Sequence, residues 1–144
     1  MIIGRYDGVV SAKRQVAFPS KFRQALGDRL IITKGLDTNL LIVSEERWQT
    51  LLEGTEDKPF IDQSTRQVQR YLFGNATELE LDAKGRFILP EYLKEWAKIV
   101  TEVLFVGVDR YVEVWSKEVW NTQEQAVATQ IQEIAQKVVG SEHE

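Results

Sequence analysis

The order of apolar and polar residues predicts a strand–loop–strand unit, a short helix and two further strands in the first part of the chain. Apolar residues 16–18 follow a polar loop and precede Pro19, which is typical of a short strand that begins after a turn. The residues that follow, up to Gly27, place their apolar side chains on one helical face. Two apolar segments at 30–33 and 40–43 then predict strands.

The second part of the chain predicts the same elements in the same order. Residues 78–82 alternate strictly between acidic residues and leucine, which predicts a strand whose leucines face inward and whose acids face water. Segment 87–89 precedes Pro90 as 16–18 precedes Pro19. The remaining predicted elements are a helix at 91–97, strands at 103–106 and 111–115, and a last helix opened by Ser116.

These parallels indicate an internal duplication. Segment Ser11–Pro19 recurs as Asp82–Pro90 at an offset of 71 residues. Further along, five residues recur at an offset of 72, so that Gly35, Asp37, Ser44, Glu46 and Trp48 match Gly107, Asp109, Ser116, Glu118 and Trp120. A single insertion between two copies explains the change of offset. The sequence therefore predicts an α+β protein built from two fused β-rich repeats with pseudo-two-fold symmetry.

We expect one compact domain over residues 1–144. Its predicted parts are repeat 1 at 1–53, a connector and helix at 54–73, repeat 2 at 74–120 and a C-terminal helix at 116–139. An apolar stripe on that last helix recurs every three or four residues, at Val127, Ile131, Ile134 and Val138. The stripe fits either packing on the helix's own domain or a seam against a neighbouring subunit.

Composition excludes several kinds of chemistry. The chain of 144 residues contains no cysteine and a single histidine, His143. Disulfides, thiolate zinc sites, cysteine nucleophiles and histidine-based triads are therefore excluded. No apolar run approaches the roughly 20 residues of a membrane span. We expect a cytoplasmic protein with no cofactor, no metal ion, no small-molecule substrate and no catalytic activity.

Charge is distributed unevenly along the chain. The formal net charge is −4, yet residues 1–34 carry seven basic and two acidic side chains, a net of +5. The remainder is acidic. A basic first repeat on an acidic body indicates one surface that faces a polyanion and another that stays away from it.

The strongest candidate for such a surface is the loop from Asp82 to Arg86. Lys84 and Arg86 extend from a strand–turn–strand frame that contains Gly85. Arginine pairs bidentately with phosphate or with guanine, whereas lysine supplies charge. A single loop of this kind equally fits an ordinary solvated turn with a local Asp–Arg salt bridge. Two basic turns at matched positions of a repeat favour DNA binding, because symmetric presentation of basic side chains suits a duplex.

The motif Asp-x-Lys-Gly-Arg, followed by three apolar residues and proline, resembles the core of the MraZ family of bacterial regulators, within the AbrB-like DNA-binding superfamily. The resemblance covers nearly the whole chain. It rests on Gly4, Lys13–Pro19, Arg70–Ala76, Asp82–Pro90, Val103–Gly107 and Glu113–Trp115.

This resemblance implies a fold and a function. The implied fold is two intertwined AbrB-like halves that form a small barrel-like core with flanking helices. The implied function is a transcriptional regulator of its own operon, which carries division and cell-wall genes. Such proteins are ring-shaped homo-oligomers that bind tandem short boxes of double-stranded DNA, and we expect a nucleoid-associated location. Loops of the Asp-x-x-x-Arg type would supply the DNA contacts.

Repeat 1 departs from that motif, because Ser11, Arg14 and Gln15 stand where its Asp, Gly and Arg belong. We expect this loop to lack an Asp–Arg pairing. Arg14, shifted by one position, would keep a guanidinium in the loop, and Gln15 would still bond a base or a phosphate.

These observations assign a set of DNA-contacting residues and leave two rival functions. The expected contacts are Lys84, Arg86, Lys13, Arg14 and Gln15, with Asp82 and Gly85 orienting their loop and with Arg5, Lys21 and Arg23 as further phosphate contacts. Arg23 could equally pair within the fold. One rival is an oligomeric scaffold or partner-binding protein with weakened DNA binding, which the altered repeat-1 loop favours. The other is a small hydrolase that uses the acidic strand around Glu80.

Overall fold

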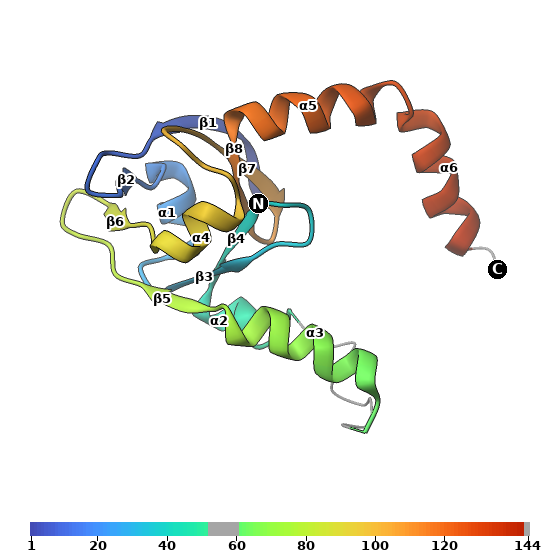
Figure 1. Cartoon of the computed structure of the whole chain (residues 1–144), viewed down its shortest axis with the longest axis horizontal. Helices are drawn as coiled ribbons and strands as arrows, with labels where there is room; N and C mark the ends of the chain where they lie inside the picture. Colours follow the sequence, from blue (N-terminus) through green and yellow to red (C-terminus); the bar gives the residue numbers. More distant parts are fainter. Residues whose placement is uncertain (52–60, 143–144) are drawn as a thin grey trace.

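The computed structural model describes residues 1–51 and 61–142 of the chain (Figure 1). The first repeat contributes β1 (Ile2–Val9), β2 (Gln15–Ala17), α1 (Ser20–Leu26), β3 (Leu30–Lys34), β4 (Leu40–Ser44) and α2 (Glu45–Trp48). Helix α3 (Gln63–Gly74) follows. The second repeat contributes β5 (Thr77–Leu79), β6 (Arg86–Ile88), α4 (Glu91–Trp96), β7 (Glu102–Asp109), β8 (Val112–Ser116) and α5 (Lys117–Ala128), and α6 (Ile131–Glu142) comes last. Of the predicted connector and helix at 54–73, residues 54–60 lie outside the described residues.

The two repeats are interlocked through exchanged strands. The main sheet is antiparallel with the order β1-β7-β8-β4-β3-β5, and β2 pairs with β6 in a separate two-stranded ribbon. Strand β1 of repeat 1 therefore pairs with β7 of repeat 2, while β5 of repeat 2 pairs with β3 of repeat 1. If each strand is replaced by its counterpart in the other repeat, the order becomes β5-β3-β4-β8-β7-β1, which is the same order read from the other edge. The predicted pseudo-two-fold symmetry is present in the pairing itself.

Two cross-strand pairs mark the symmetry axis. Val16 pairs with Phe87 in the ribbon, and Leu41 pairs with Glu113 at the centre of the sheet. The residues of the first pair are 71 apart and those of the second 72 apart, so each residue faces its own counterpart. The inserted residue falls between α4 and β7. Five residues separate these two elements and three separate α1 from β3, and one of the two extra residues arises because α4 is one residue shorter than α1.

The core lies between the sheet, the ribbon and the two short helices. Phe18 is its aromatic centre, because its ring makes edge contacts with Phe105 at 5.9 Å and with Phe87 at 6.5 Å between centroids. Phe22 of α1 and Leu93 of α4, which are matched positions, are both fully buried. Each such side chain contributes about 1.5–3 kcal/mol through the removal of apolar surface from water. The ribbon is thus anchored to the body of the protein.

The barrel implied by the family resemblance is not confirmed. Strands β1 and β5 occupy the two edges of the main sheet and do not pair with each other, and β2 and β6 pair only with each other. No closed barrel is found among the described strands. The alternation at 78–82 also yields a shorter strand than predicted, since β5 ends at Leu79 and the chain then enters the loop that contains Asp82.

The predicted C-terminal helix at 116–139 is two helices. Helix α5 ends at Ala128 and α6 begins at Ile131. At the break, the Thr129 hydroxyl donates to the Ala126 carbonyl at 3.0 Å, and the Gln130 amide donates to the Val127 carbonyl at 2.9 Å. These three-residue turns replace the regular helical bonds and change the direction of the chain.

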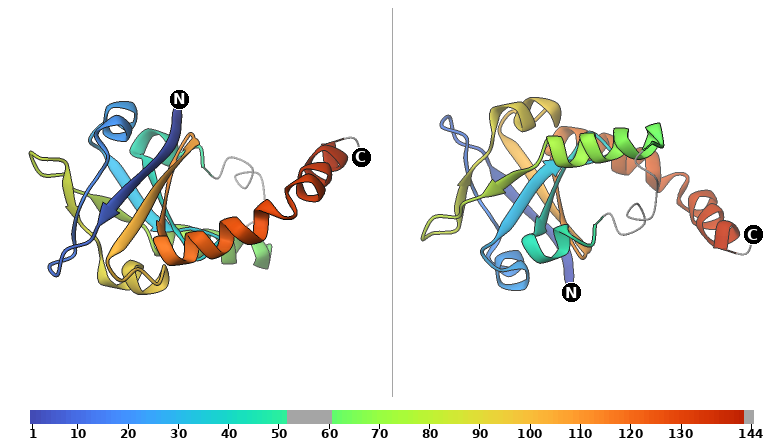
Figure 2. Two further views of the ribbon diagram at one scale, coloured as in Figure 1. Left: turned by 90° about the horizontal axis from the view of Figure 1, so that it is seen from above. Right: turned by 90° about the horizontal axis from the view of Figure 1, so that it is seen from below.

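Helices α3 and α6 extend away from the sheet on one side of the molecule (Figures 1 and 2). Helix α5 packs on β7 and β8, where Trp120 makes an edge contact with Trp115 at 5.3 Å between ring centroids. The C-terminal end of α3 contacts β3, where the Thr33 hydroxyl donates to the Leu72 carbonyl at 2.7 Å. Ile131 of α6 is 52 % exposed. Across residues 1–51 and 61–142, none of the helices has the length and apolar character that crossing a membrane requires.

Candidate nucleic-acid interface

The two polar loops project together from one end of the molecule. The loop between β1 and β2 and the loop between β5 and β6 lie beside the ribbon, on the side away from α3 and α6, and all three views agree on this (Figures 1 and 2). Lys13 and Lys84, at the tips, are exposed. The fold therefore brings the two basic loops of the repeats to a common surface.

The repeat-2 loop is fixed by the carboxylate of Asp82. Its Oδ1 accepts hydrogen bonds from the backbone N–H groups of Lys84 and Arg86, both at 2.9 Å. Its Oδ2 accepts from Nε of Arg86, also at 2.9 Å. The backbone N–H of Arg86, and then its side chain and the N–H of Lys84, hold the pKa of Asp82 below its usual value. One side chain thus defines both the loop backbone and the direction of the arginine.

The repeat-1 loop has the same backbone structure with a different capping group. The Ser11 hydroxyl accepts from the N–H groups of Lys13 at 3.2 Å and Gln15 at 3.1 Å, as Asp82 does in repeat 2. The Ser11 amide donates to the Gln15 carbonyl at 3.0 Å, and the Arg14 amide donates to the Ser11 carbonyl at 2.9 Å. The Asp–Arg pairing is missing, as expected, but the loop keeps its shape because a serine hydroxyl caps this turn as well.

Arg14 is not the shifted equivalent of Arg86. It takes the backbone position of Gly85, with φ of 61° against 78° for the glycine. Its Nη1 lies 3.4 Å from Oε2 of Glu91 at the start of α4, so the guanidinium is directed toward the other repeat. The residue that does stand at the position of Arg86 is Gln15.

Each loop also accepts a backbone hydrogen bond from the residue that directly follows the ribbon strand of the opposite repeat. The Phe18 amide donates to the Gly85 carbonyl at 2.9 Å, and the Leu89 amide donates to the Arg14 carbonyl at 2.7 Å. These bonds are related by the repeat offset. Because Phe18 and Leu89 are buried core residues, both loops are attached directly to the core.

The three further basic residues lie in different surroundings. Arg5 forms an ion pair with Glu124 at 2.8 Å and lies over the ring of Trp120, so α5 engages it apart from the loops. Arg23 pairs with Asp28 at 2.8 Å, the pairing within the fold that the sequence left open, and its side chain lies next to Gly85. Lys21 is exposed on α1.

The acidic strand offers no hydrolytic arrangement. Both carboxylate oxygens of Asp82 are used within its loop, while Glu78 and Glu80 are exposed. Within residues 1–51 and 61–142, no group of three or more potential metal-ligating side chains is found.

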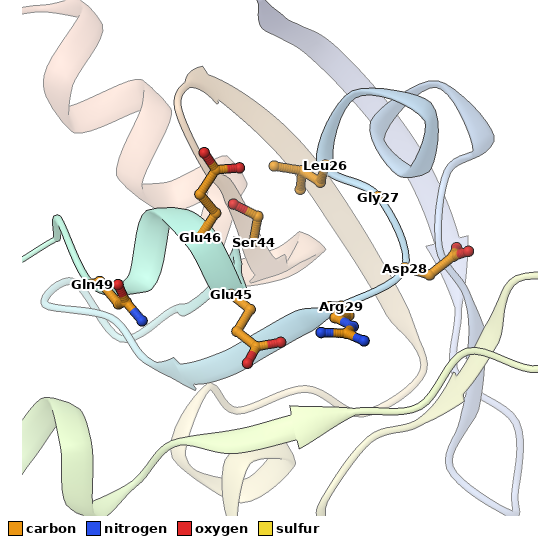
Figure 3. A pocket seen from close by; sticks show the side chains of 8 residues that line it. All are labelled: Leu26, Gly27, Asp28, Arg29, Ser44, Glu45, Glu46 and Gln49. Carbon is orange, nitrogen blue, oxygen red and sulfur yellow. The ribbon is translucent and has the colours of Figure 1, made fainter.

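A pocket between the end of α1 and the start of α2 has no catalytic arrangement either (Figure 3). Its charged lining is Asp28, Arg29, Glu45 and Glu46. The Ser44 hydroxyl accepts from the Arg47 amide at 3.1 Å as a helix cap. The excess of carboxylates also disfavours an anionic ligand there.

Two fused, strand-exchanged copies of a β-rich unit, with matched loops at one end, define a duplicated α+β protein. Known relatives of this kind are transcriptional regulators. The chain is 40% identical over 96% of its length, and over 97% of the relative, to the "Transcriptional regulator MraZ" of Carboxydothermus hydrogenoformans. It is 37% identical over 94% of its length, and over 95% of the relative, to the protein of that name from Caldanaerobacter subterraneus.

The family model described as "MraZ protein, putative antitoxin-like" matches the chain twice, at residues 11–71 and 72–140. The chain belongs to the MraZ family of transcriptional regulators. The family predicted from the loop motif is thereby confirmed, and it is not a family of enzymes.

Proposed function

We propose that the protein regulates transcription of its own division and cell-wall operon by binding tandem upstream boxes of double-stranded DNA as a ring-shaped homo-oligomer. The observation that carries this proposal is the pair of loops with matched backbone hydrogen bonds at one end of the molecule. We place the protein in the cytoplasm, associated with the nucleoid. It needs no cofactor and performs no catalysis.

The contacting residues divide by chemistry. Lys13 and Lys84 are exposed at the loop tips and supply charge to phosphates. Arg86 donates to Asp82 through Nε, and we assign its two Nη groups to DNA. Asp82 and Gly85 set the loop, and Lys21 and Arg23 reach phosphates beside it. Arg14 also contacts DNA, although its ion pair with Glu91 weakens that contact. We assign no DNA contact to Arg5, which pairs with Glu124.

Oligomerisation is part of this binding mechanism. A single pair of loops makes few phosphate contacts, so non-specific binding has a Kd of roughly 10⁻⁴ to 10⁻⁶ M. A ring that presents several copies to tandem boxes makes the later contacts intramolecular and adds about 10² to 10⁴ in avidity. A monomeric variant that binds one box as tightly as the ring binds tandem boxes would contradict this mechanism.

A band-shift titration on the protein's own upstream DNA at several salt concentrations tests the proposal. We expect affinity to fall steeply with salt and to be lost in Arg86→Ala and in Lys13→Ala/Arg14→Ala. Lys137→Ala removes one charge from α6, far from the loops, and should leave the titration unchanged. Binding that is absent, or that ignores salt, would overturn the proposal.

The alternative function is an oligomeric scaffold or partner-binding protein. The observation that favours it is the altered repeat-1 loop, where Gln15 stands in place of the motif's arginine and Glu91 pairs with Arg14. A ring that assembles normally but does not bind DNA at low salt would support this alternative.

A further inference from the structure

We propose that the two repeats recognise different bases: Arg86 binds a guanine and Gln15 binds an adenine, so that each box consists of two unlike half-sites in a fixed order. This inference rests on the proposed function and specifies which bases that function distinguishes.

The first step is the outer face of the ribbon. Val16 of β2 and Phe87 of β6 are both 2 % exposed and point into the core. Because side chains alternate along a strand, their neighbours point the other way. Four side chains form this face, namely Gln15, Ala17, Arg86 and Ile88. A two-stranded antiparallel ribbon has the width that the major groove admits.

The second step is symmetry. The pseudo-two-fold axis passes through the pair Val16–Phe87, so Gln15 and Arg86 stand on opposite sides of it at equivalent positions. A ribbon placed with its axis on the dyad of the duplex presents these two side chains to equivalent places in the two half-sites. The position in one half-site that Arg86 contacts is therefore equivalent to the position in the other half-site that Gln15 contacts.

The third step is the chemistry of the two side chains. Asp82 fixes the Arg86 guanidinium through Nε, and the two remaining Nη groups match the O6 and N7 acceptors of guanine. The Gln15 amide has one donor group and one acceptor, which match N7 and N6 of adenine. Within the described parts of the chain, the Gln15 side chain has no hydrogen bond or ion pair, so its amide is available.

Neither Arg14 nor Ser11 supplies a second arginine held as Arg86 is held. Arg14 stands at the position of Gly85 and is directed to Glu91. Ser11 accepts backbone N–H groups and carries no charge to orient a guanidinium. The two loops share one backbone and differ in the group that they present. A box therefore fits the protein in one orientation, and tandem boxes must all point the same way.

The experiment measures competition binding by fluorescence anisotropy, with every single base-pair substitution across one box of the upstream DNA. For the wild type we expect one G·C pair and one A·T pair, at equivalent distances from the centre, whose substitution each weakens binding by roughly 5- to 150-fold. Gln15→Ala should remove the A·T preference alone. Ser11→Asp/Gln15→Arg should convert that preference to G·C and make the preferred box symmetric.

Ser11→Asp/Gln15→Arg leaves the net charge unchanged, and Gln132→Arg, on exposed α6, controls for an arginine added away from the ribbon. The inference is overturned if Gln15→Arg with Ser11→Asp raises affinity but leaves the preferred base unchanged, since position 15 would then contact only phosphate. It is also overturned if the wild type prefers the same base in both half-sites. Absence of salt-dependent binding by the wild type to any duplex would instead overturn the proposed function itself.

Discussion

Arg14 and Gly85 occupy the same backbone position in the two repeats, and both are left-handed, with φ of 61° and 78°. Glycine adopts this region without cost, whereas an L-residue with a Cβ loses about 1–2 kcal/mol there. The repeat-1 loop therefore carries strain that the repeat-2 loop does not, although their hydrogen bonds match.

We expect Arg14→Gly to be more stable than Arg14→Ala by about 1 kcal/mol, because both lose the Glu91 pairing but only alanine keeps the strain. Urea denaturation with equal m-values measures the difference. Ala17→Gly, in strand β2, is the control and should show the opposite sign, because glycine weakens an ordinary strand. An alanine variant as stable as the glycine variant would show that position 14 is unstrained.

The cap at Asp82 provides a second comparison. Asp82→Ser copies Ser11 and should keep the loop backbone bonds while it loses the bond to Nε of Arg86. Asp82→Ala should lose all three bonds and melt at a lower temperature than the serine variant. Thermal unfolding measures this order. Equal melting temperatures for serine and alanine would mean that the hydroxyl does not replace the carboxylate as a cap.

The same carboxylate gives the stability a pH dependence. Its pKa is lowered in the folded protein, so its contribution is complete above the unfolded value of about 3.9 and is lost as pH falls through the lower folded value. We expect the stability advantage of the wild type over Asp82→Ser to shrink below about pH 4. Urea midpoints of both proteins from pH 7 to pH 3 test this. An advantage that stays constant would place the folded pKa at its ordinary value.

Gly107 is required by close packing between the repeats. A Cβ there would lie 2.8 Å from the backbone carbon of Ile2 and the backbone nitrogen of Ile3, so β1 would have to move. We expect Gly107→Ala to destabilise the fold by about 2 kcal/mol or more. Gly140→Ala, in helix α6 where an added Cβ meets nothing within 4 Å, should be stabilising and serves as the control. Hydrogen exchange at β1 amides would show where the loss occurs.

Local patterns were sufficient to predict most elements. The apolar segments 30–33, 40–43 and 103–106 are strands β3, β4 and β7, because buried β-rich runs have a clear signature. The predicted length of the last helix was wrong. Its apolar residues keep their helical spacing past the break at Thr129, and this spacing does not reveal that the chain changes direction there.

Pairing partners and loop geometry could not be predicted in the same way. Nothing local in β1 specifies that it pairs with β7 of the other repeat, because strand pairing is a long-range property. The role of Ser11 was also missed, although its alignment with Asp82 was visible. A hydroxyl and a carboxylate would interact differently with DNA, but either group can accept the backbone N–H groups of a turn. The same alignment placed Arg14 on Gly85, but a left-handed backbone at position 14 was not predicted from that match.

Strand exchange has a consequence for how the two loops came to differ. A single repeat would leave its first strand without a partner, and it would regain one only by pairing with a second copy of itself. In such a homodimer, every substitution at one end of the ribbon would appear at the other end too. Joining the copies in one polypeptide removes that constraint. Serine, arginine and glutamine could then replace aspartate, glycine and arginine in one half while the other half kept them.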